Sequence, residues 1–238
     1  MESPDILAVK GLGQFQQFKI ASEFRRLIEN WHLSDFHVQA ARPDQEISAA
    51  THLSTRGDNI ASFARYMHEE HSERFHDVLK KLASRVPGIQ TVSSQDTADG
   101  RIVLRFADGS FKDPFLARYV SDGTIRMFAY LLLLNDPSPH PLLCVEEPEN
   151  QLYPELLEGL AEEFREYAEG GGQVFVSTHS PDFLDALRPS EVYLIKKDGG
   201  ASTAIPIAQS ASVNELVGLG DRLGSLLRQN ALWELANR

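Results

Sequence analysis

The sequence predicts an α/β fold in which a mainly parallel sheet is flanked by helices and follows a smaller unit of helices and a β-hairpin. Two short apolar runs, at residues 142–145 and 173–177, are too short for helices and predict buried strands. Between them, residues 155–168 have the spacing of an amphipathic helix, which ends at three glycines. A strand, a helix and a second strand in this order predict parallel pairing.

Residues 1–112 are predicted to form the smaller unit. Ser22 can cap a helix with one apolar stripe, and residues 31–55 are predicted to be irregular because they lack periodicity and contain Pro43. The stripe consists of Phe24, Leu27, Ile28 and Trp31. The remaining predicted elements of this unit are two helices and a hairpin, at residues 60–67, 72–83, 91–94 and 101–106.

Residues 113–238 are predicted to form the larger unit, which contains the parallel sheet. A buried helix is predicted after Ser121 or Asp122, either of which can cap it. After the second buried strand, the sequence predicts a short helix, a hairpin and a glycine-interrupted helical tail, at residues 182–187, 191–207 and 213–235.

The composition excludes several classes of protein. With 42% hydrophobic and 24% charged residues it is ordinary for a globular protein, and no apolar run approaches the roughly 18 residues that cross a bilayer. No membrane association and a cytoplasmic location are therefore expected. The single cysteine, Cys144, excludes an internal disulfide, and its place in an apolar run predicts a buried, inert thiol.

The net charge of −11 is concentrated in the second half, where residues 111–238 hold 10 basic and 19 acidic side chains. An acidic surface repels a phosphate backbone, so this half is not favoured as a DNA contact. Much of the charge is predicted to lie on the solvated face of one helix, at Glu155, Glu158, Glu162, Glu163, Glu166 and Glu169.

Two carboxylates follow the first buried strand directly. Glu146 and Glu147 precede Pro148, which stops further strand pairing, and the carboxyl end of a parallel strand is where ligands bind in open α/β sheets. In this position Glu146 can hold Mg²⁺ and Glu147 can orient the water that attacks a γ-phosphate. The alternative is a surface strand end with two solvated glutamates.

Two further stretches bear on this choice. Gly123 lies in a turn that opens a buried helix, where free amides and the helix dipole suit an anion, although any capped core helix looks similar. His179 follows the second buried strand and is predicted to face the same crevice as the two glutamates.

The other histidines lack metal-ligand spacing. His32, His37 and His52 are predicted to be surface or partner-contact residues. The cluster of His68, His71 and His76 has no nearby carboxylate pattern, and a metal site there is not favoured.

Three motifs in register, SDGTIR at residues 121–126, LLCVEEPEN at 142–150 and STHSP at 177–181, resemble the second half of an ABC-type ATPase. The resemblance is to the bacterial predicted-ATPase (AAA-like) group related to the RecF, chromosome-maintenance and overcoming-lysogenization-defect ATPases. Residues 53–63, LSTRGDNIASF, are similar to a further segment of that group. Residues 1–112 resemble the helical and β insertion that precedes the signature loop, and residues 113–238 resemble the C-terminal lobe.

The resemblance implies an ATP phosphohydrolase that uses ATP and Mg²⁺. It places Ser121, Asp122 and Gly123 in the signature loop and Asn150 in the D-loop. Both loops are nucleotide-binding segments in that group. The remaining roles that it implies are the Walker B magnesium ligand for Glu146, the catalytic base for Glu147 and the switch histidine for His179. Two departures are Glu146 where the family has aspartate, and Tyr153 where it has histidine.

A larger departure is that the sequence contains no GxxxxGK[ST] motif, the Walker A loop that holds the β- and γ-phosphates. The chain is therefore expected to be a C-terminal portion or a split half that is inactive alone. The expected partners are a second copy or a missing N-terminal Walker A half, with DNA contacted through the complete protein.

Two functions are compatible with the sequence. The first is ATP hydrolysis coupled to DNA repair, DNA maintenance or defence against foreign DNA, a task implied only by the resemblance. The alternative is a catalytically inactive protein-interaction module derived from an ATPase, which would use the helices of residues 20–85.

Overall fold

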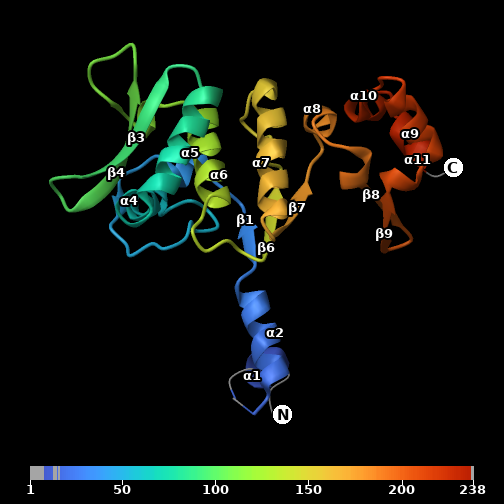
Figure 1. The fold of residues 1–238 in the computed structure, drawn as a ribbon, viewed down its shortest axis with the longest axis horizontal. Coiled ribbons are helices and arrows are strands. Elements are labelled where there is room, and N and C mark those ends of the chain that lie inside the picture. Colours follow the sequence, from blue (N-terminus) through green and yellow to red (C-terminus); the bar gives the residue numbers. More distant parts are fainter. Residues whose placement is uncertain (1–7, 13–14, 16, 237–238) are drawn as a thin grey trace.

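The protein has an α/β fold, and the computed structural model describes residues 8–12, 15 and 17–236. Figure 1 shows helices α4, α5 and α6 beside the β3 and β4 hairpin at one end of the molecule, and α8 to α11 with β8 and β9 at the other. Between them lie α7 and a three-stranded sheet. The predicted α/β class with a parallel sheet flanked by helices is confirmed.

The three-stranded sheet is entirely parallel and has the order β1, β6, β7. Its strands are β1 (His32–Ser34), β6 (Leu142–Glu146) and β7 (Gln173–Ser177). In the central row, Leu33 lies beside Cys144 and Cys144 lies beside Phe175. Both strands predicted from apolar runs are therefore present, and they are neighbours.

Only one face of this sheet is covered. Leu143 and Val145 point into the core, whereas Leu33 and Phe175, on the opposite face, are 61% and 57% exposed. Cys144 lies between these two and is half-buried, not buried as predicted. Residues 142–145 are thus only partly buried, with Leu143 and Val145 in the core, because the helices packed on the sheet lie on one side of it.

All three predicted helices of the N-terminal unit are present, and two of them lie at nearly the predicted positions. In α4 (Ile60–Glu70) and α5 (Ser72–Arg85) the predicted stripes enter the core, with Phe63 and Phe75 buried. The predicted hairpin is β3 (Ile89–Asp96) with β4 (Arg101–Asp108). The first helix, α2 (Lys19–Glu29), buries no residue.

Two predictions for this unit are wrong. Ser22 does not cap a helix, because α2 begins at Lys19 and contains it. Residues 31–55 are not uniformly irregular, since they contain β1, α3 (Val38–Ala41) and β2 (Gln45–Glu46). These elements are too short to show a period, and β1 is stabilised by pairing with β6, more than a hundred residues later in the chain.

The remaining elements largely follow the predicted order. The parallel sheet packs on the helices that precede and follow β6, which are α6 (Asp122–Leu134) and α7 (Leu157–Glu169). The other elements are α1 (Ala8–Leu12), β5 (Phe115–Leu116), α8 (Pro181–Asp185), β8 (Tyr193–Asp198), β9 (Ala201–Pro206), α9 (Ala211–Gly218), α10 (Leu223–Arg228) and α11 (Ala231–Ala236). The division at residue 112 stays a prediction.

One glutamate of α7 is buried, contrary to the predicted solvated face. Glu163 accepts hydrogen bonds from Lys81 Nζ at 2.6 Å and from an Arg85 Nη at 2.5 Å, and thereby joins α7 to α5. A buried carboxylate requires such partners because its charge loses hydration. Sequence periodicity does not reveal that another helix covers this position.

The N-terminus of α6 packs on the loop that follows β6. A Cβ atom built on Gly123 would lie 2.8 Å from the Gln151 carbonyl oxygen, so a glycine is needed for this close approach. The buried Arg126 guanidinium donates to the Asn150 carbonyl at 2.5 Å and to the Phe36 carbonyl at 2.8 Å. Here Gly123 therefore accommodates the chain's own backbone.

We expect Gly123→Ala to lower the free energy of unfolding by about 1–3 kcal/mol, because the added methyl group must displace the Gln151 backbone. Gly218→Ala in α9 is the matched control, because a Cβ there meets nothing within 4 Å. It should be neutral or stabilising by up to about 1 kcal/mol. Urea denaturation measures both changes, and equal stabilities for the two variants would contradict the packing described.

Candidate functional site

The carboxyl ends of the three parallel strands lie at one edge of the sheet. Ser34 lies beside Val145, and Glu146 lies beside Ser177, so the residues that follow each strand emerge together. Asp35 follows β1, Glu147 follows β6 and Thr178 follows β7. This is the edge at which open α/β sheets bind ligands.

Glu147 and His179 meet at this edge, as the sequence predicts. The His179 Nε2 atom is 3.5 Å from the Glu147 Oε1 atom, and the His179 backbone N–H donates to Oε2 at 3.4 Å. The His179 ring is 95% exposed and so is accessible to a ligand. Glu147 has a left-handed backbone with φ of 42°, and its N–H donates to the Ser177 carbonyl at 2.9 Å. Such a conformation is rare for a side chain other than glycine and is found disproportionately at functional sites.

The pKa of Glu147 is raised above its ordinary value. Partial burial of the carboxylate is the main cause, and the like charge and hydrogen-bonding position of Glu149 add to it. The contacts with His179 act in the opposite direction. A carboxylate with a raised pKa is a stronger proton acceptor, which suits a general base.

Glu149 begins the D-loop that the resemblance implies, but no individual role was predicted for it. Its Oε1 atom accepts hydrogen bonds from the Thr178 hydroxyl and from the Ser180 backbone N–H, so it ties the loop after β6 to the loop after β7. Its Oε2 atom is buried and has no hydrogen-bond partner among the described residues. The only signal in the sequence is the third carboxylate in the EEPEN run.

Glu146 is the last residue of β6 and is exposed at the same edge. The oxygen donors of Glu146, Glu147 and Glu149 are the hard ligands that Mg²⁺ prefers, and Mg²⁺ commonly takes one or two carboxylates and completes its coordination with water and phosphate oxygens. The unpartnered Glu149 oxygen is a further donor. Glu147 and Glu149, which interact directly, therefore offer oxygen donors of the kind that a magnesium ion takes.

The predicted signature residues lie at the start of α6. Ser121 caps the helix by accepting from the Thr124 N–H at 3.2 Å, while Asp122 is paired with Arg42 and is not free to contact a ligand without breaking that pair. Asn150 joins the two regions: its N–H donates to the Glu147 carbonyl at 3.1 Å and its carbonyl accepts from Arg126.

The structure adds one polar pair that sequence reasoning missed, because β1 was not predicted. His37 Nε2 lies 3.0 Å from Asp35 Oδ2, just beyond the end of β1. A cavity of about 530 Å³ is lined mainly by residues of the N-terminal unit and by none of the predicted site residues. It is lined by Gln39, Arg42, Pro43, Asp44, Asp99, Arg101 and Arg118.

No helix in the described residues is long and apolar enough to span a bilayer.

Comparison with known proteins identifies the group. A solved SMC head bound to the C-winged helix domain of ScpA is 14% identical, with a TM-score of 0.51 over 78% of this chain and 60% of that chain, and it shows the same fold. An SMC ATPase described for its ATP-driven dimerization and DNA stimulated activation is 13% identical, with a TM-score of 0.46 over 65% of this chain and 97% of that one.

The chain thus covers less than two thirds of the first of these proteins. No curated protein matches the chain. A family model described as "AAA domain, putative AbiEii toxin, Type IV TA system" matches residues 13–185, which is well over half of the sequence. The chain belongs to this family of AAA-domain proteins.

Proposed function

We propose that this chain supplies the hydrolytic residues of an ATPase, and that a segment with a phosphate-binding loop completes the site. The observation that carries the proposal is the pairing of Glu147 with His179 at the carboxyl edge of the parallel sheet, where the pKa of Glu147 is raised. A base and an exposed histidine at this position are the groups required to orient a water molecule against a γ-phosphate.

In the proposed mechanism each residue has one role. Glu147 accepts a hydrogen bond from the attacking water and draws its proton, and His179 donates a hydrogen bond to the γ-phosphate. Glu146 would hold Mg²⁺, which supplies charge neutralisation at the phosphate oxygens. Glu149 is a positioning residue, because it fixes the Thr178 and Ser180 loop that carries His179.

The uncovered face of the parallel sheet supports the need for a partner. Parallel sheets are ordinarily covered on both faces. Here Leu33 and Phe175 are exposed on either side of the half-buried Cys144. An apolar face of this kind indicates an interaction surface. We infer that the lobe bearing the phosphate-binding loop packs on this face and so completes an ATPase unit. Two such units would then associate, and the loop of Ser121, Asp122 and Gly123 in one would contact the nucleotide held by the other.

The task coupled to hydrolysis belongs to the proposal as well. Among DNA repair, DNA maintenance and defence against foreign DNA, the family description, which names a type IV TA system, favours defence. The second half of the chain has a net charge of −9 and is therefore not favoured as the DNA contact. DNA would bind other parts of the complete protein.

We expect Glu147→Gln in the complete ATPase to retain ATP binding and to lose turnover by on the order of 100-fold or more, because the amide keeps the size of the side chain but cannot accept a proton. Glu155→Gln, an exposed carboxylate change after the same loop, is the control. Phosphate release and equilibrium ATP binding measure the two effects. Turnover of Glu147→Gln within a few-fold of the parent would exclude Glu147 as the base.

The raised pKa of Glu147 also predicts the pH dependence of turnover. Since the base acts when ionised, turnover should fall as the pH drops through this pKa, so the acid limb of the rate profile should lie above the ordinary glutamate value of 4.5. Glu149→Gln removes a like charge and should move that limb to lower pH. A limb that stays in place or moves upward in Glu149→Gln would contradict the assignment, and Glu155→Gln should leave it unchanged.

The uncovered face predicts self-association of the 238-residue chain on its own. Phe175→Ser should shift the chain toward monomer, because it removes an exposed aromatic ring from the centre of that face. Phe111→Ser is the control, since Phe111 is equally exposed but lies in the connection after β4. Sedimentation equilibrium distinguishes them, and the same association constant for the parent and Phe175→Ser would argue against this face as the contact.

A further inference from the structure

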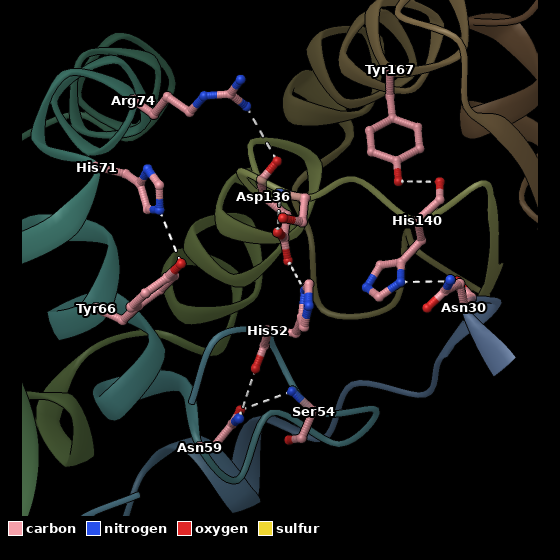
Figure 2. A network of polar contacts seen from close by, with 11 residues as sticks. Asn30, His52, Ser54, Asn59, Tyr66, His71, Arg74, Asp136, His140 and Tyr167 are labelled. Carbon is pink, nitrogen blue, oxygen red and sulfur yellow. Dashed lines mark hydrogen bonds and ion pairs between the residues drawn. The ribbon is translucent and has the colours of Figure 1, made fainter. Parts of the chain in front are cut away.

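Three segments bring two imidazoles and a buried carboxylate together at the opposite, amino-terminal end of the parallel sheet. His52 comes from the loop before α4, and Asp136 and His140 come from the connection between α6 and β6. One ligand atom from each lies within 4.8 Å of the others. Figure 2 shows the three side chains converging.

We propose that His52, Asp136 and His140 form a binding site for a zinc ion. Two histidine nitrogens and one carboxylate oxygen are a ligand set that Zn²⁺ takes in proteins, with water in the fourth position. Shifts of side chains alone can bring atoms at these separations to the roughly 2.0–2.2 Å that zinc requires.

The hydrogen bonds of His140 orient it as a ligand. Its Nδ1 atom lies 3.0 Å from the Asn30 carbonyl oxygen, so Nδ1 carries the hydrogen and Nε2 carries the lone pair. That Nε2 atom is buried and has no hydrogen-bond partner among the described residues. A hydrogen bond from the other ring nitrogen to a backbone carbonyl is the usual way in which proteins fix the tautomer of a metal-binding histidine. The Tyr167 hydroxyl also donates to the His140 carbonyl at 2.7 Å and holds its backbone in place.

Asp136 is fixed in the same manner. It is only 1% exposed, its Oδ1 atom accepts from the Ser138 N–H at 2.9 Å, and its Oδ2 atom lies 2.8 Å from His52 Nδ1. These two atoms now share a hydrogen bond, and an ion bound between them would displace its proton. A carboxylate at this depth needs a positive partner, and a divalent ion provides one.

His32 supports the assignment from the side of β1. Its ring stacks on that of His140 with centroids 4.7 Å apart, it is 7% exposed, and its Nε2 atom also has no hydrogen-bond partner in the described part of the chain. The unpartnered His32 Nε2 atom adds a further nitrogen beside the proposed ligands.

The site would join the start of β1 to the core. Asn30 and His32 flank Trp31 at the connection between α2 and β1, so an ion held by His140 would immobilise that connection against the α6 to β6 segment. The site lies at the end of the strands opposite to Glu147 and so is separate from the proposed ATPase site.

Zinc titration of the chelator-treated, untagged chain tests the site by calorimetry. We expect His52→Ala and His140→Ala to bind Zn²⁺ on the order of 100-fold more weakly than the parent. His76→Ala, an exposed histidine in α5, should bind as the parent does. Glu147→Gln should also bind normally, which separates this site from the proposed ATPase site. Equal affinity in the parent and the two ligand variants would overturn the proposal.

Two further measurements guard against misfolding of the variants. Zinc should raise the melting temperature of the parent and of His76→Ala, and should not raise that of His52→Ala, whose side chain is partly exposed and is the safest to remove. Cobalt bound to the parent should give the intense visible absorption of a four-coordinate ion. A parent that shows neither a zinc-dependent melting shift nor this spectrum has no such site.

Discussion

The backbone ladder between β6 and β7 determines where the candidate site forms. The register that places Glu146 beside Ser177 continues one residue further, because the Glu147 N–H donates to the Ser177 carbonyl. This bond holds Glu147 in its left-handed conformation and directs its side chain toward His179. The contact between an exposed imidazole and a carboxylate contributes little to stability by itself, so the sheet positions the pair.

The same ladder gathers like charges. Glu146, Glu147 and Glu149 lie within four residues at one sheet edge, and the proximity of Glu149 contributes to the raised pKa of Glu147. Such a group of carboxylates is stabilised by cations. Within the proposed function these cations are Mg²⁺ and basic groups of the lobe that carries the phosphates, so nucleotide binding and assembly of the site would be coupled.

The parallel sheet has different chemistry at its two ends, and β1 contributes to both. His32, at the start of β1, stacks on His140, whereas Asp35, just after β1, pairs with His37 at the carboxyl edge. The three-residue strand β1 thus connects the proposed zinc site to the carboxyl edge of the sheet, where Glu147 lies. A change in the position of β1 relative to β6 would therefore alter the contacts at both ends of the sheet.

The sequence by itself determined the local elements and the acidic strand end. Apolar runs located the strands β6 and β7, and stripes of apolar residues located the helices α4, α5 and α6. These patterns lie within each segment and so can be recognised without knowing its neighbours. The pairing of Glu147 with His179 followed from one rule about parallel strands. The tertiary structure alone decided what depends on distant pairing. It revealed β1, the buried ion pairs of Glu163, the bond from Glu149 to the Thr178 loop, and the approach of His52 to His140. It also identified Leu33 and Phe175 as the residues that form the exposed face of the sheet, because strand pairing decides which side chains lie together there.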